Sequence, residues 1–502
     1  MSDWTQGYVT EVEYTQGFYK ELAPAHLEFA ALLQGYEAPS TAKPFNWIEV
    51  GCGHGVTANV LAAANPSGKF YAMDFNPLHV LSGRELASAA GLNNIEFFEK
   101  SFEEAMTLDL PPMDYFILHG VYSWISQANR KHIVALIRKL LKPGGLVYVS
   151  YNCLPGWSGK APVRKLMTEY AKRHGASIAQ RFVAARDFAK AMKESECGYF
   201  NMHPTAVQLV NQLSAQSSNY LIHEYLNDAW ELLYHSDVVA EMHDAKATYM
   251  CSATLNENAD NANIPANLRP LVTQETDPVM RELIKDFATN RQFRRDIFAR
   301  GARRLSGSEL IARVSAVRIC LTISPEKCTP QIRVPLGEAT LQLEFYHPII
   351  DALTKGAQSV AALTQAVNKP LPDVLNTLLL MAGAGYVQPL LTEPDQSGKS
   401  VNRFNAEQLK RAVHGKNISI LAARNLGNGM GLGLIESLFL SAYNAKAHDP
   451  AAWVQEILVR TNRAPLDNDK AITEHSDMLS HLRKFENDFK KMLPMLKTWG
   501  VL

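Results

Sequence analysis

Residues 49–55 read Glu-Val-Gly-Cys-Gly-His-Gly, and this stretch decides the fold of the N-terminal half of the chain. It follows an apolar run, 45–50, that is typical of a buried strand, and it leads into an alanine-rich run, 55–64, that is typical of a helix. Glycines between a strand and a helix allow a tight turn and let the backbone approach a ligand closely. The pattern therefore predicts a ligand-binding turn after the first strand.

The sequence on both sides of this turn continues the same alternation. Between Pro44 and Leu154, short apolar runs alternate with longer amphipathic runs, and Gly, Pro and Asn separate them. This cadence predicts an α/β fold with a parallel, doubly wound sheet. Strands are expected at 45–50, 69–73, 95–99, 113–119 and 146–151, and helices at 55–64, 76–90 and 130–141.

Two acidic residues narrow the choice of ligand. Asp74 ends the second expected strand, 23 residues after Gly51, and this spacing suits a carboxylate that accepts both hydroxyls of a ribose. Glu49 precedes the glycine turn, where its charge would repel a pyrophosphate. The turn also closes as G-x-G-x-G rather than as the dinucleotide pattern G-x-G-x-x-G. The alternatives are a nucleoside ligand without phosphates, or an ordinary glycine turn that binds no ligand.

The sequence E-x-G-x-G-x-G resembles motif I of class I methyltransferases that use S-adenosyl-L-methionine (AdoMet), a ligand with an ammonium and a sulfonium. The resemblance implies a Rossmann-like methyltransferase core. Ser101 and Phe102 resemble the adenine-contacting position, although the family more often has Asp where Ser101 stands, and core packing is the alternative for Phe102. Tyr14 is expected to close over the cofactor. The cofactor-binding residues that the resemblance implies are Glu49, Gly51, Gly53, Gly55, Asp74, Ser101, Phe102, His119 and Tyr14.

Segments outside motif I resemble a narrower family. They look like bacterial methyltransferases with an attached regulatory domain, a family that includes protein lysine methyltransferases acting on rickettsial outer membrane proteins. These segments are 14–24, 119–124, 149–157, 220–237 and 290–296. The resemblance implies AdoMet-dependent methyl transfer to a protein lysine amine, with an outer membrane protein precursor as one substrate class.

A lysine nucleophile must be neutral when it attacks the sulfonium methyl, and its unperturbed pKa is about 10.4. Aromatic walls and neutral acceptors would favour the neutral amine, and the carboxyl ends of the fourth and fifth strands are where such a site is expected. The candidates for this catalytic role are Tyr122, Tyr151, Asn152 and Trp157. Hinge packing is the alternative for Trp157, and capping of a turn is the alternative for Asn152.

The chain is long enough for about three domains. A polar, Asn-rich stretch at 256–268 is expected to be a linker, and three short helices followed by a strand at 342–391 resemble a winged helix. The expected divisions are an N-terminal helical cap at 1–36, an AdoMet-binding core at 37–256 with a helical insertion at about 160–217, a linker and helical regulatory region at 257–335, a winged-helix-like domain at 336–395 and a C-terminal helical region at 396–502.

Composition limits the partners. The 502 residues include 50 Lys and Arg against 50 Asp and Glu, so the net charge is zero and attraction to nucleic acid is not expected. The densest basic run, from Arg291 to Arg304, is expected to be a solvated helix face or a contact for an acidic partner. The six cysteines are scattered without a C-x-x-C pair, and no metal site is expected. No apolar run is long enough to cross a bilayer and no signal peptide is recognised, so a cytoplasmic protein is expected.

Two rival functions stay open. The first is a small-molecule O- or N-methyltransferase, in which a metabolite takes the place of the protein substrate. The second is a noncatalytic, AdoMet-sensing regulator whose winged helix binds DNA with the help of Arg294 and Arg295. Winged-helix units also serve dimerisation, so a homodimer is a further alternative.

Overall fold

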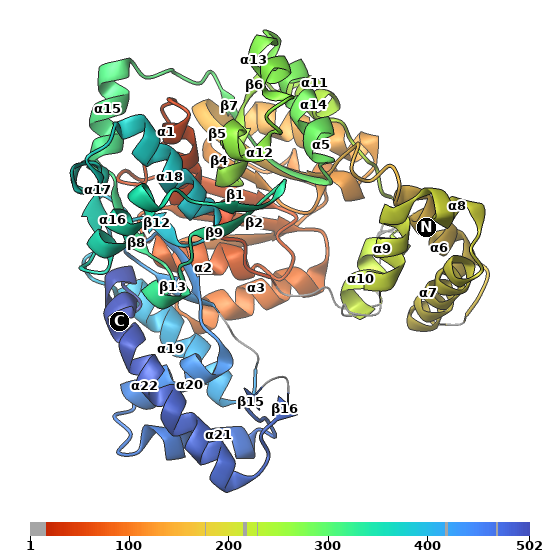
Figure 1. Cartoon of the computed structure of the whole chain (residues 1–502). Helices are drawn as coiled ribbons and strands as arrows, with labels where there is room; N and C mark the ends of the chain where they lie inside the picture. Colours follow the sequence, from red (N-terminus) through yellow and green to blue (C-terminus); the bar gives the residue numbers. More distant parts are fainter. Residues whose placement is uncertain (1–16, 176, 214–217, 228, 417–419, 468–469) are drawn as a thin grey trace.

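The structure is a computed structural model, and it describes residues 17–175, 177–213, 218–227, 229–416, 420–467 and 470–502. An α/β body surrounds a central sheet, a group of helices projects from one side of it, and the C-terminal helices form a separate lobe below it (Figure 1). No helix among the described residues is both long enough and apolar enough to span a membrane.

Seven strands form the central sheet in the order β3-β2-β1-β4-β5-β7-β6. The first five strands are parallel, and β7 runs antiparallel between β5 and β6. The strands are β1 Asn46–Val50, β2 Lys69–Asp74, β3 Ile95–Glu99, β4 Met113–Leu118, β5 Leu141–Asn152, β6 Ala247–Ser252 and β7 Phe293–Arg300. The predicted doubly wound α/β fold is confirmed, and the order reverses between β1 and β4, where such sheets bind ligands.

Successive residues of each parallel strand enter different hydrophobic cores, because side chains alternate between the two faces of a sheet. On β1, Trp47 lies in one core and Ile48 in the other, and both are fully buried. Burial on both faces explains why these strands read as continuous apolar runs. The flanking helices are α1 Pro24–Leu33, α2 Val56–Ala64, α3 Pro77–Ala89, α4 Phe102–Ala105, α5 Gln127–Leu140 and α11 His235–Asp244.

The core does not end at residue 256, as expected, because β7 returns at 293–300 to pair with both β5 and β6. The expected linker and helical region at 257–335 is therefore wrong as a division of the fold. Its Asn-rich start is ordered: the short helices η3 Leu255–Asn258 and α12 Asp260–Asn263 follow β6 directly. Asn263 is buried, and its amide donates to the carbonyl of Asn256. Helices α13 Arg269–Gln274 and α14 Pro278–Thr289 then lead into β7.

The arginine run is not a helix face, because its first half belongs to β7 and to the turn before it. Arg294 is 0% exposed and contacts Asp286 at 2.5 Å, Asp296 at 3.0 Å and Glu282 at 2.9 Å. Arg295 pairs with Glu21 at 2.9 Å. A guanidinium with no exposed surface cannot contact a DNA phosphate, so Arg294 cannot play the part that the DNA-binding rival gives it.

The segment that resembles a winged helix has its three helices and its strand in the expected order. They are α16 Leu343–Leu353, α17 Val360–Val367, α18 Leu371–Gly383 and β12 Val387–Pro389. The expected start at 336 is wrong, because β8 Arg318–Leu321 lies between β11 Gln358–Ser359 and β12 in a small sheet. Helix α15 Gly307–Ala316 and the hairpin of β9 Gln331–Val334 and β10 Gly337–Thr340 precede α16.

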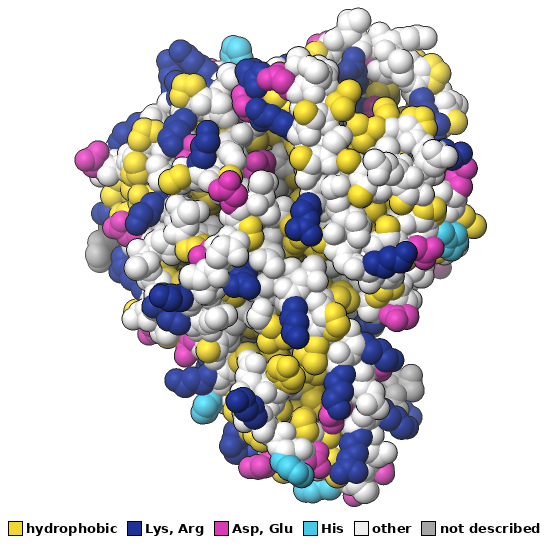
Figure 2. All heavy atoms as spheres, turned by 90° about the vertical axis from the view of Figure 1, so that its left-hand side faces the viewer, with side chains coloured by type: hydrophobic (Ala, Val, Ile, Leu, Met, Phe, Trp, Pro, Cys, Tyr) yellow, Lys and Arg dark blue, Asp and Glu magenta, His cyan; other side chains and the backbone are white. Residues whose placement is uncertain are grey.

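Helix α18 is used inside the molecule. Its Gly383 packs so closely against Asn256 of η3 that a Cβ there would overlap the Asn256 side chain. On the face that carries α15 to α17, Figure 2 shows numerous Lys and Arg side chains with fewer acidic groups among them.

The helical insertion has a core of its own and stands to one side of the sheet (Figure 1). Its helices are α6 Ala161–Ala171, α7 Ile178–Glu194, α8 Gly198–Met202, α9 Pro204–Gln212 and α10 Ser218–Leu226. Helix α10 begins just after the bounds expected for the insertion, packs against α6 and α7, and is the one of these five helices whose described residues line the cavity presented below.

The C-terminal region is helical with one exception that matters for the site. Its helices are α19 Lys399–Val413, α20 Leu434–Asn444, α21 Pro450–Arg460 and α22 His475–Trp499. The exception is a hairpin of β13 Ile420–Ala423 and β14 Asn428–Gly431, which packs against α2. A second, shorter hairpin pairs β15 Leu466–Asp467 with β16 Lys470–Ala471. The glycine-rich stretch 427–433 contains β14, the second strand of the first hairpin.

Candidate active site

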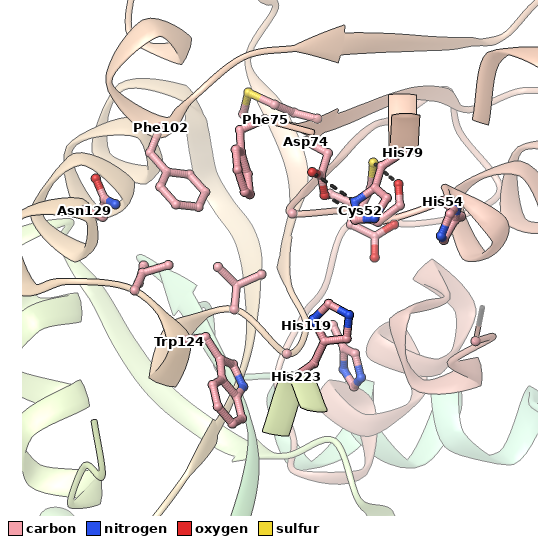
Figure 3. Close-up of a pocket in the computed structure, with 18 of the residues that line it drawn as sticks. Cys52, His54, Asp74, Phe75, His79, Phe102, His119, Trp124, Asn129 and His223 are labelled. Atoms are coloured by element: carbon pink, nitrogen blue, oxygen red, sulfur yellow. Dashed lines mark hydrogen bonds and ion pairs between the residues drawn. The ribbon is translucent and has the colours of Figure 1, made fainter. Parts of the chain in front are cut away.

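A cavity of about 360 Å³ opens at the carboxyl ends of β1, β2 and β4 (Figure 3). It therefore lies at the point where the strand order reverses. Of the nine expected cofactor residues, seven line it: Glu49, Gly51, Gly53, Asp74, Ser101, Phe102 and His119. Gly55 lies outside the lining, and Tyr14 lies outside the described residues.

The glycine turn has a left-handed backbone that favours glycine. Gly51 has a φ of 80°, and its amide donates to the Met73 carbonyl at 2.7 Å, which ties the turn to β2. A Cβ on Gly51 would overlap the side chain of Val121. Gly53 has a φ of 52°, and its Cβ position is open, with no heavy atom within 4 Å. Gly55 instead packs under Phe97 at the start of α2, so its role here is in packing.

Glu49 brings to the cavity a carboxyl group with one unpaired oxygen. Its side chain is 4% exposed, and its Oε2 atom has no hydrogen-bond partner. Burial, together with the nearby charge of Asp74, raises the pKa of Glu49 to about 8. A buried carboxyl group without a partner destabilises the ligand-free protein, and a cationic ligand would favour its charged form.

Asp74 is held firmly at the end of β2. Its Oδ2 accepts from the Gly53 amide at 2.9 Å, and its Oδ1 accepts from the Asn76 amide at 2.9 Å. The Nδ1 atom of His79 lies 3.2 Å from Oδ1. These contacts fix the carboxylate in one orientation, and Oδ2, which accepts from one donor, retains lone-pair capacity for a ligand hydroxyl.

Two phenylalanines lie at one end of the cavity. Phe102 begins α4, and Phe75 follows Asp74 directly; both side chains point into the cavity in Figure 3. Ser101 lines the cavity as well, but its hydroxyl caps α4 by accepting from the Glu104 amide at 3.2 Å. Phe75 was not among the expected cofactor residues, although its position directly after Asp74, the acid that ends the second strand, was a usable signal.

His119 and Tyr19 form an aromatic pair on the cavity wall. Their ring centroids are 3.7 Å apart, and both residues line the cavity. The Nδ1 atom of His119 lies 2.9 Å from the hydroxyl of Tyr148, and burial lowers the pKa of His119 to about 4. His119 is therefore neutral near pH 7. Closure over the ligand was expected from Tyr14, whereas the structure brings Tyr19 to the wall.

The far end of the cavity is a wall that we call the acceptor wall. It is formed by the short helix η2 Tyr122–Trp124, the start of α5, and α10 with the residues after it. Its apolar members are Val121, Trp124 and Ile125, and Glu224 of α10 carries its carboxylate. Among the described residues that line the acceptor wall, Glu224 is the only acid.

The four residues expected to touch an acceptor do not line the cavity. Tyr122 is fully buried, and its hydroxyl donates to Glu241 at 2.5 Å. Tyr151 points to the other side of β5, where its hydroxyl donates to Asp296 at 2.6 Å. Both hydroxyls bond to neighbouring elements of the fold. Burial raises the pKa of both tyrosines, and the charge of Glu241 adds to this for Tyr122, as that of Asp296 does for Tyr151.

Asn152 and Trp157 also have structural contacts. The backbone amide of Asn152 donates to the Ser123 hydroxyl at 2.8 Å, and its carbonyl accepts from the Leu233 amide. Trp157 is 8% exposed and meets Trp230 edge-on at 5.3 Å between ring centroids. These contacts fit the structural alternatives, a turn for Asn152 and packing for Trp157, better than they fit a catalytic role.

Among the described residues, no group of three or more His, Cys, Asp or Glu side chains is placed to hold a metal ion. The side chains that line the cavity include carboxyl groups, aromatic rings and the neutral imidazole of His119.

Two families match parts of the chain. Residues 43–224 match a family described as "Methyltransferase domain", and residues 217–300 match a family described as "Predicted methyltransferase regulatory domain". The second match confirms the resemblance seen in 220–237 and 290–296. Together with the fold, the regulatory match means that this segment supplies β6 and β7 of the central sheet.

Relatives and solved structures extend these matches. An uncharacterized protein of Synechocystis sp. is 36% identical over 504 residues, which cover 99% of each chain. An uncharacterized protein of Rickettsia prowazekii is 27% identical over 67% of this chain and 60% of its own. The structure of PKMT2 from Rickettsia typhi in complex with AdoHcy is 19% identical with a TM-score of 0.72, covering 95% of this chain and 98% of that one, so the two share a fold over nearly their whole length.

Proposed function

Because this chain belongs to a family of AdoMet-dependent methyltransferases with a methyltransferase regulatory domain, we propose that it methylates the side-chain amine of a protein lysine. One observation carries the proposal: the carboxyl group of Glu49, with its unpaired Oε2, and the acceptor wall line the same cavity. A cationic cofactor would bind at the Glu49 end of the cavity, and an apolar side chain with a terminal amine would bind at the acceptor wall.

The residues of the cavity fit AdoMet. Glu49 would attract its positively charged methionine portion, Asp74 would accept from the ribose hydroxyls, and Phe75 and Phe102 offer ring faces to the adenine. Gly53 leaves open space beside the turn. When bound, AdoMet supplies an electrophilic methyl group on a sulfonium centre. The PKMT2 structure with AdoHcy supports this assignment, because AdoHcy is AdoMet without that methyl group.

The acceptor wall favours a neutral amine. Val121, Trp124 and Ile125 can line the four methylene groups of a lysine, and burial among them lowers the pKa of an ammonium. Glu224 is the carboxylate on this wall that can receive the proton before the amine attacks. The amine gains the methyl group and a positive charge as the sulfonium loses both, so charge is conserved.

The DNA-binding sensor is disfavoured by the burial of Arg294, as described above. The small-molecule alternative has weak support: the relative named O-methyltransferase 3, from Dictyostelium discoideum, is 29% identical over only 22% of this chain. A metabolite acceptor is therefore kept as an outcome of the experiment.

The test is transfer of an isotopically labelled methyl group from AdoMet into a fractionated cell extract. Asp74→Asn should abolish labelling, because it removes one charged acceptor from the ribose site. Asp109→Asn is the matched control, since Asp109 is an exposed acid in the loop before β4, outside the cavity. Label recovered as methylated lysine after acid hydrolysis of the protein fraction would support the proposal.

Two outcomes would contradict it. Label in metabolites alone would make the acceptor a small molecule, and the AdoMet site would stand. No label in any fraction, with AdoMet still bound by calorimetry, would make the chain a noncatalytic binder. Glu224→Gln separates the two halves of the mechanism further: it should lower the transfer rate while the affinity for AdoMet is unchanged.

A further inference from the structure

Residues 17–22, which we call the strap, precede α1 and contribute to the wall of the cavity. Gly17 and Tyr19 of the strap line the cavity, and the rings of Tyr19 and His119 are in contact at an interplanar angle of 38°. The backbone amide of Tyr19 donates to the Thr57 hydroxyl on α2 at 3.3 Å. The position of Tyr19 therefore depends on what holds the strap in place.

The C-terminal region holds the strap through the hairpin of β13 and β14. The side-chain amide of Asn428 donates to the Lys20 carbonyl at 3.0 Å, across 408 residues of sequence. Asn428 is 2% exposed, and its Oδ1 accepts from the Gly429 amide at 2.8 Å, which orients the side chain. A Cβ on Gly429 would lie 2.6 Å from the Phe18 ring, so the hairpin and the strap are in close contact.

The regulatory segment holds the strap from the other side. The Nε atom of Arg295, on β7, lies 2.9 Å from a carboxylate oxygen of Glu21. Glu21 is the residue between Lys20 and the buried Leu22. Two regions far apart in the sequence thus fix neighbouring residues of one short segment, and that segment carries Tyr19.

We propose that Asn428 is a positioning residue for cofactor binding, and that it acts by holding the strap so that Tyr19 stays in the cavity wall. The inference rests on the proposed AdoMet site. Neither family match reaches Asn428, because the two matches end at residues 224 and 300. The C-terminal region thereby contributes to AdoMet affinity through one hydrogen bond, from the Asn428 amide to the Lys20 carbonyl.

A purely structural role for Asn428 predicts something different. If the hairpin served only to attach the C-terminal lobe, its loss would lower the melting temperature and leave AdoMet affinity unchanged in the folded protein. Asn425 offers the matched control, because its side-chain amide also donates to a carbonyl, that of Thr498 on α22, at 2.9 Å. This bond anchors α22 and does not touch the strap.

The experiment measures AdoMet affinity by calorimetry on the full chain, with Asn428→Ala and Asn425→Ala each made alone and in a Tyr19→Ala background. Asn428→Ala should weaken binding about 5-fold, the usual effect of one hydrogen bond. Asn425→Ala should leave affinity unchanged. In the Tyr19→Ala background, Asn428→Ala should cause no further loss, because two residues that act through one element are not additive.

Asn428→Asp is the second variant, for the case in which the alanine variant does not fold. It keeps the acceptor for the Gly429 amide but cannot donate to the Lys20 carbonyl, so the same weakening is expected. Faster hydrogen exchange at the Tyr19 and Leu22 amides should accompany it. Wild-type affinity in folded Asn428 variants, an equal loss in Asn425→Ala, or a full additional loss without Tyr19 would each overturn the inference alone. A wild-type chain that does not bind AdoMet would overturn the proposed function as well.

Discussion

Glu49 and Asp74 stand at the carboxyl ends of neighbouring strands and face one cavity, yet their surroundings differ. Asp74 accepts two backbone amides, whereas Glu49 keeps an oxygen with no hydrogen-bond partner. The charge of Asp74 also contributes to the raised pKa of Glu49. The pair thus consists of one carboxylate fixed for hydroxyl groups and one carboxyl group that gains its charge when a cation arrives.

The first prediction is that AdoMet affinity increases with pH between about 5.5 and 7.5. The pKa of Glu49 is about 8, so over this range the free protein holds a proton there that a bound ammonium expels. The expected change is up to about tenfold per pH unit. Glu49→Gln should bind more weakly at pH 7.5 and show no such slope. Calorimetry in two buffers with different ionisation enthalpies measures the released proton, and a wild-type slope that survives in Glu49→Gln would contradict the assignment.

The second prediction compares two glycines of the same turn. Gly53→Ala should fold with a loss of about 1–2 kcal/mol from its left-handed backbone, because its Cβ position is open. Its methyl group would occupy cofactor space, so AdoMet affinity should fall at least about tenfold, the effect of roughly 1.4 kcal/mol. Gly51→Ala should be less stable than Gly53→Ala, since its Cβ overlaps Val121. Thermal unfolding with and without AdoMet ranks the two variants, and the opposite order would refute the reading of this turn.

The third prediction concerns Tyr151. Tyr151→Phe leaves Asp296 without one of its donors in a buried site, and we expect a loss of about 1–3 kcal/mol in the free energy of unfolding. The rate of methyl transfer should be unchanged, because Tyr151 does not line the cavity. Denaturant unfolding and the transfer assay measure the two effects separately. An inactive but stable Tyr151→Phe protein would restore the catalytic role that the sequence suggested.

The fourth prediction concerns the buried ion pairs of β7. Arg294→Met should cost about 3–5 kcal/mol, because it strands the carboxylates of Asp286, Asp296 and Glu282. Arg303→Met, which removes a half-exposed partner of Glu37, should have little effect. Binding of DNA should not distinguish Arg294→Met from the wild type.

The same buried ion pairs make the free energy of unfolding of the wild type fall at acid pH. Burial opposes ionisation of Asp296, but the Arg294 guanidinium and His235 outweigh it and lower the pKa of Asp296 to about 2. A lowered pKa stabilises the folded state above the ordinary aspartate pKa of about 3.9, and this stabilisation is lost as pH falls toward 2. Chemical unfolding from pH 5 to pH 2.5 should therefore show a steeper loss for the wild type than for Arg294→Met.

The sequence predicted the parts of the fold that depend on local pattern. The five parallel strands and the glycine turn are local, since each is an apolar run or a glycine motif within a few residues. The sequence could not predict β7, which reads Phe-Arg-Arg-Asp-Ile-Phe-Ala-Arg. Its charges are acceptable in a buried strand only because Asp286 and Glu282 of α14 face Arg294, and that partnership exists only in three dimensions.

The site shows the same division. The residues of the glycine turn were predicted to line a cavity, and Asp74 with them, because their backbone positions follow from the strand order. The four proposed acceptor-contacting residues lie near the right strand ends, but their side chains turn elsewhere: Tyr151 points to Asp296 and Tyr122 to Glu241. Strand alternation and tertiary partners decide such directions. Local pattern could not place Tyr19, because the side chain that bonds to the neighbouring Lys20 carbonyl, Asn428, is 408 residues away from Lys20 along the chain.

The position of β7 between β5 and β6 determines what happens when the regulatory segment is deleted. A strand that is hydrogen-bonded along both edges cannot be deleted without exposing both of its neighbours. A gene that lost the regulatory segment would encode a sheet ending at an open β5, which invites aggregation. The catalytic and regulatory segments therefore share one sheet, and a chain truncated before residue 217 is expected to aggregate.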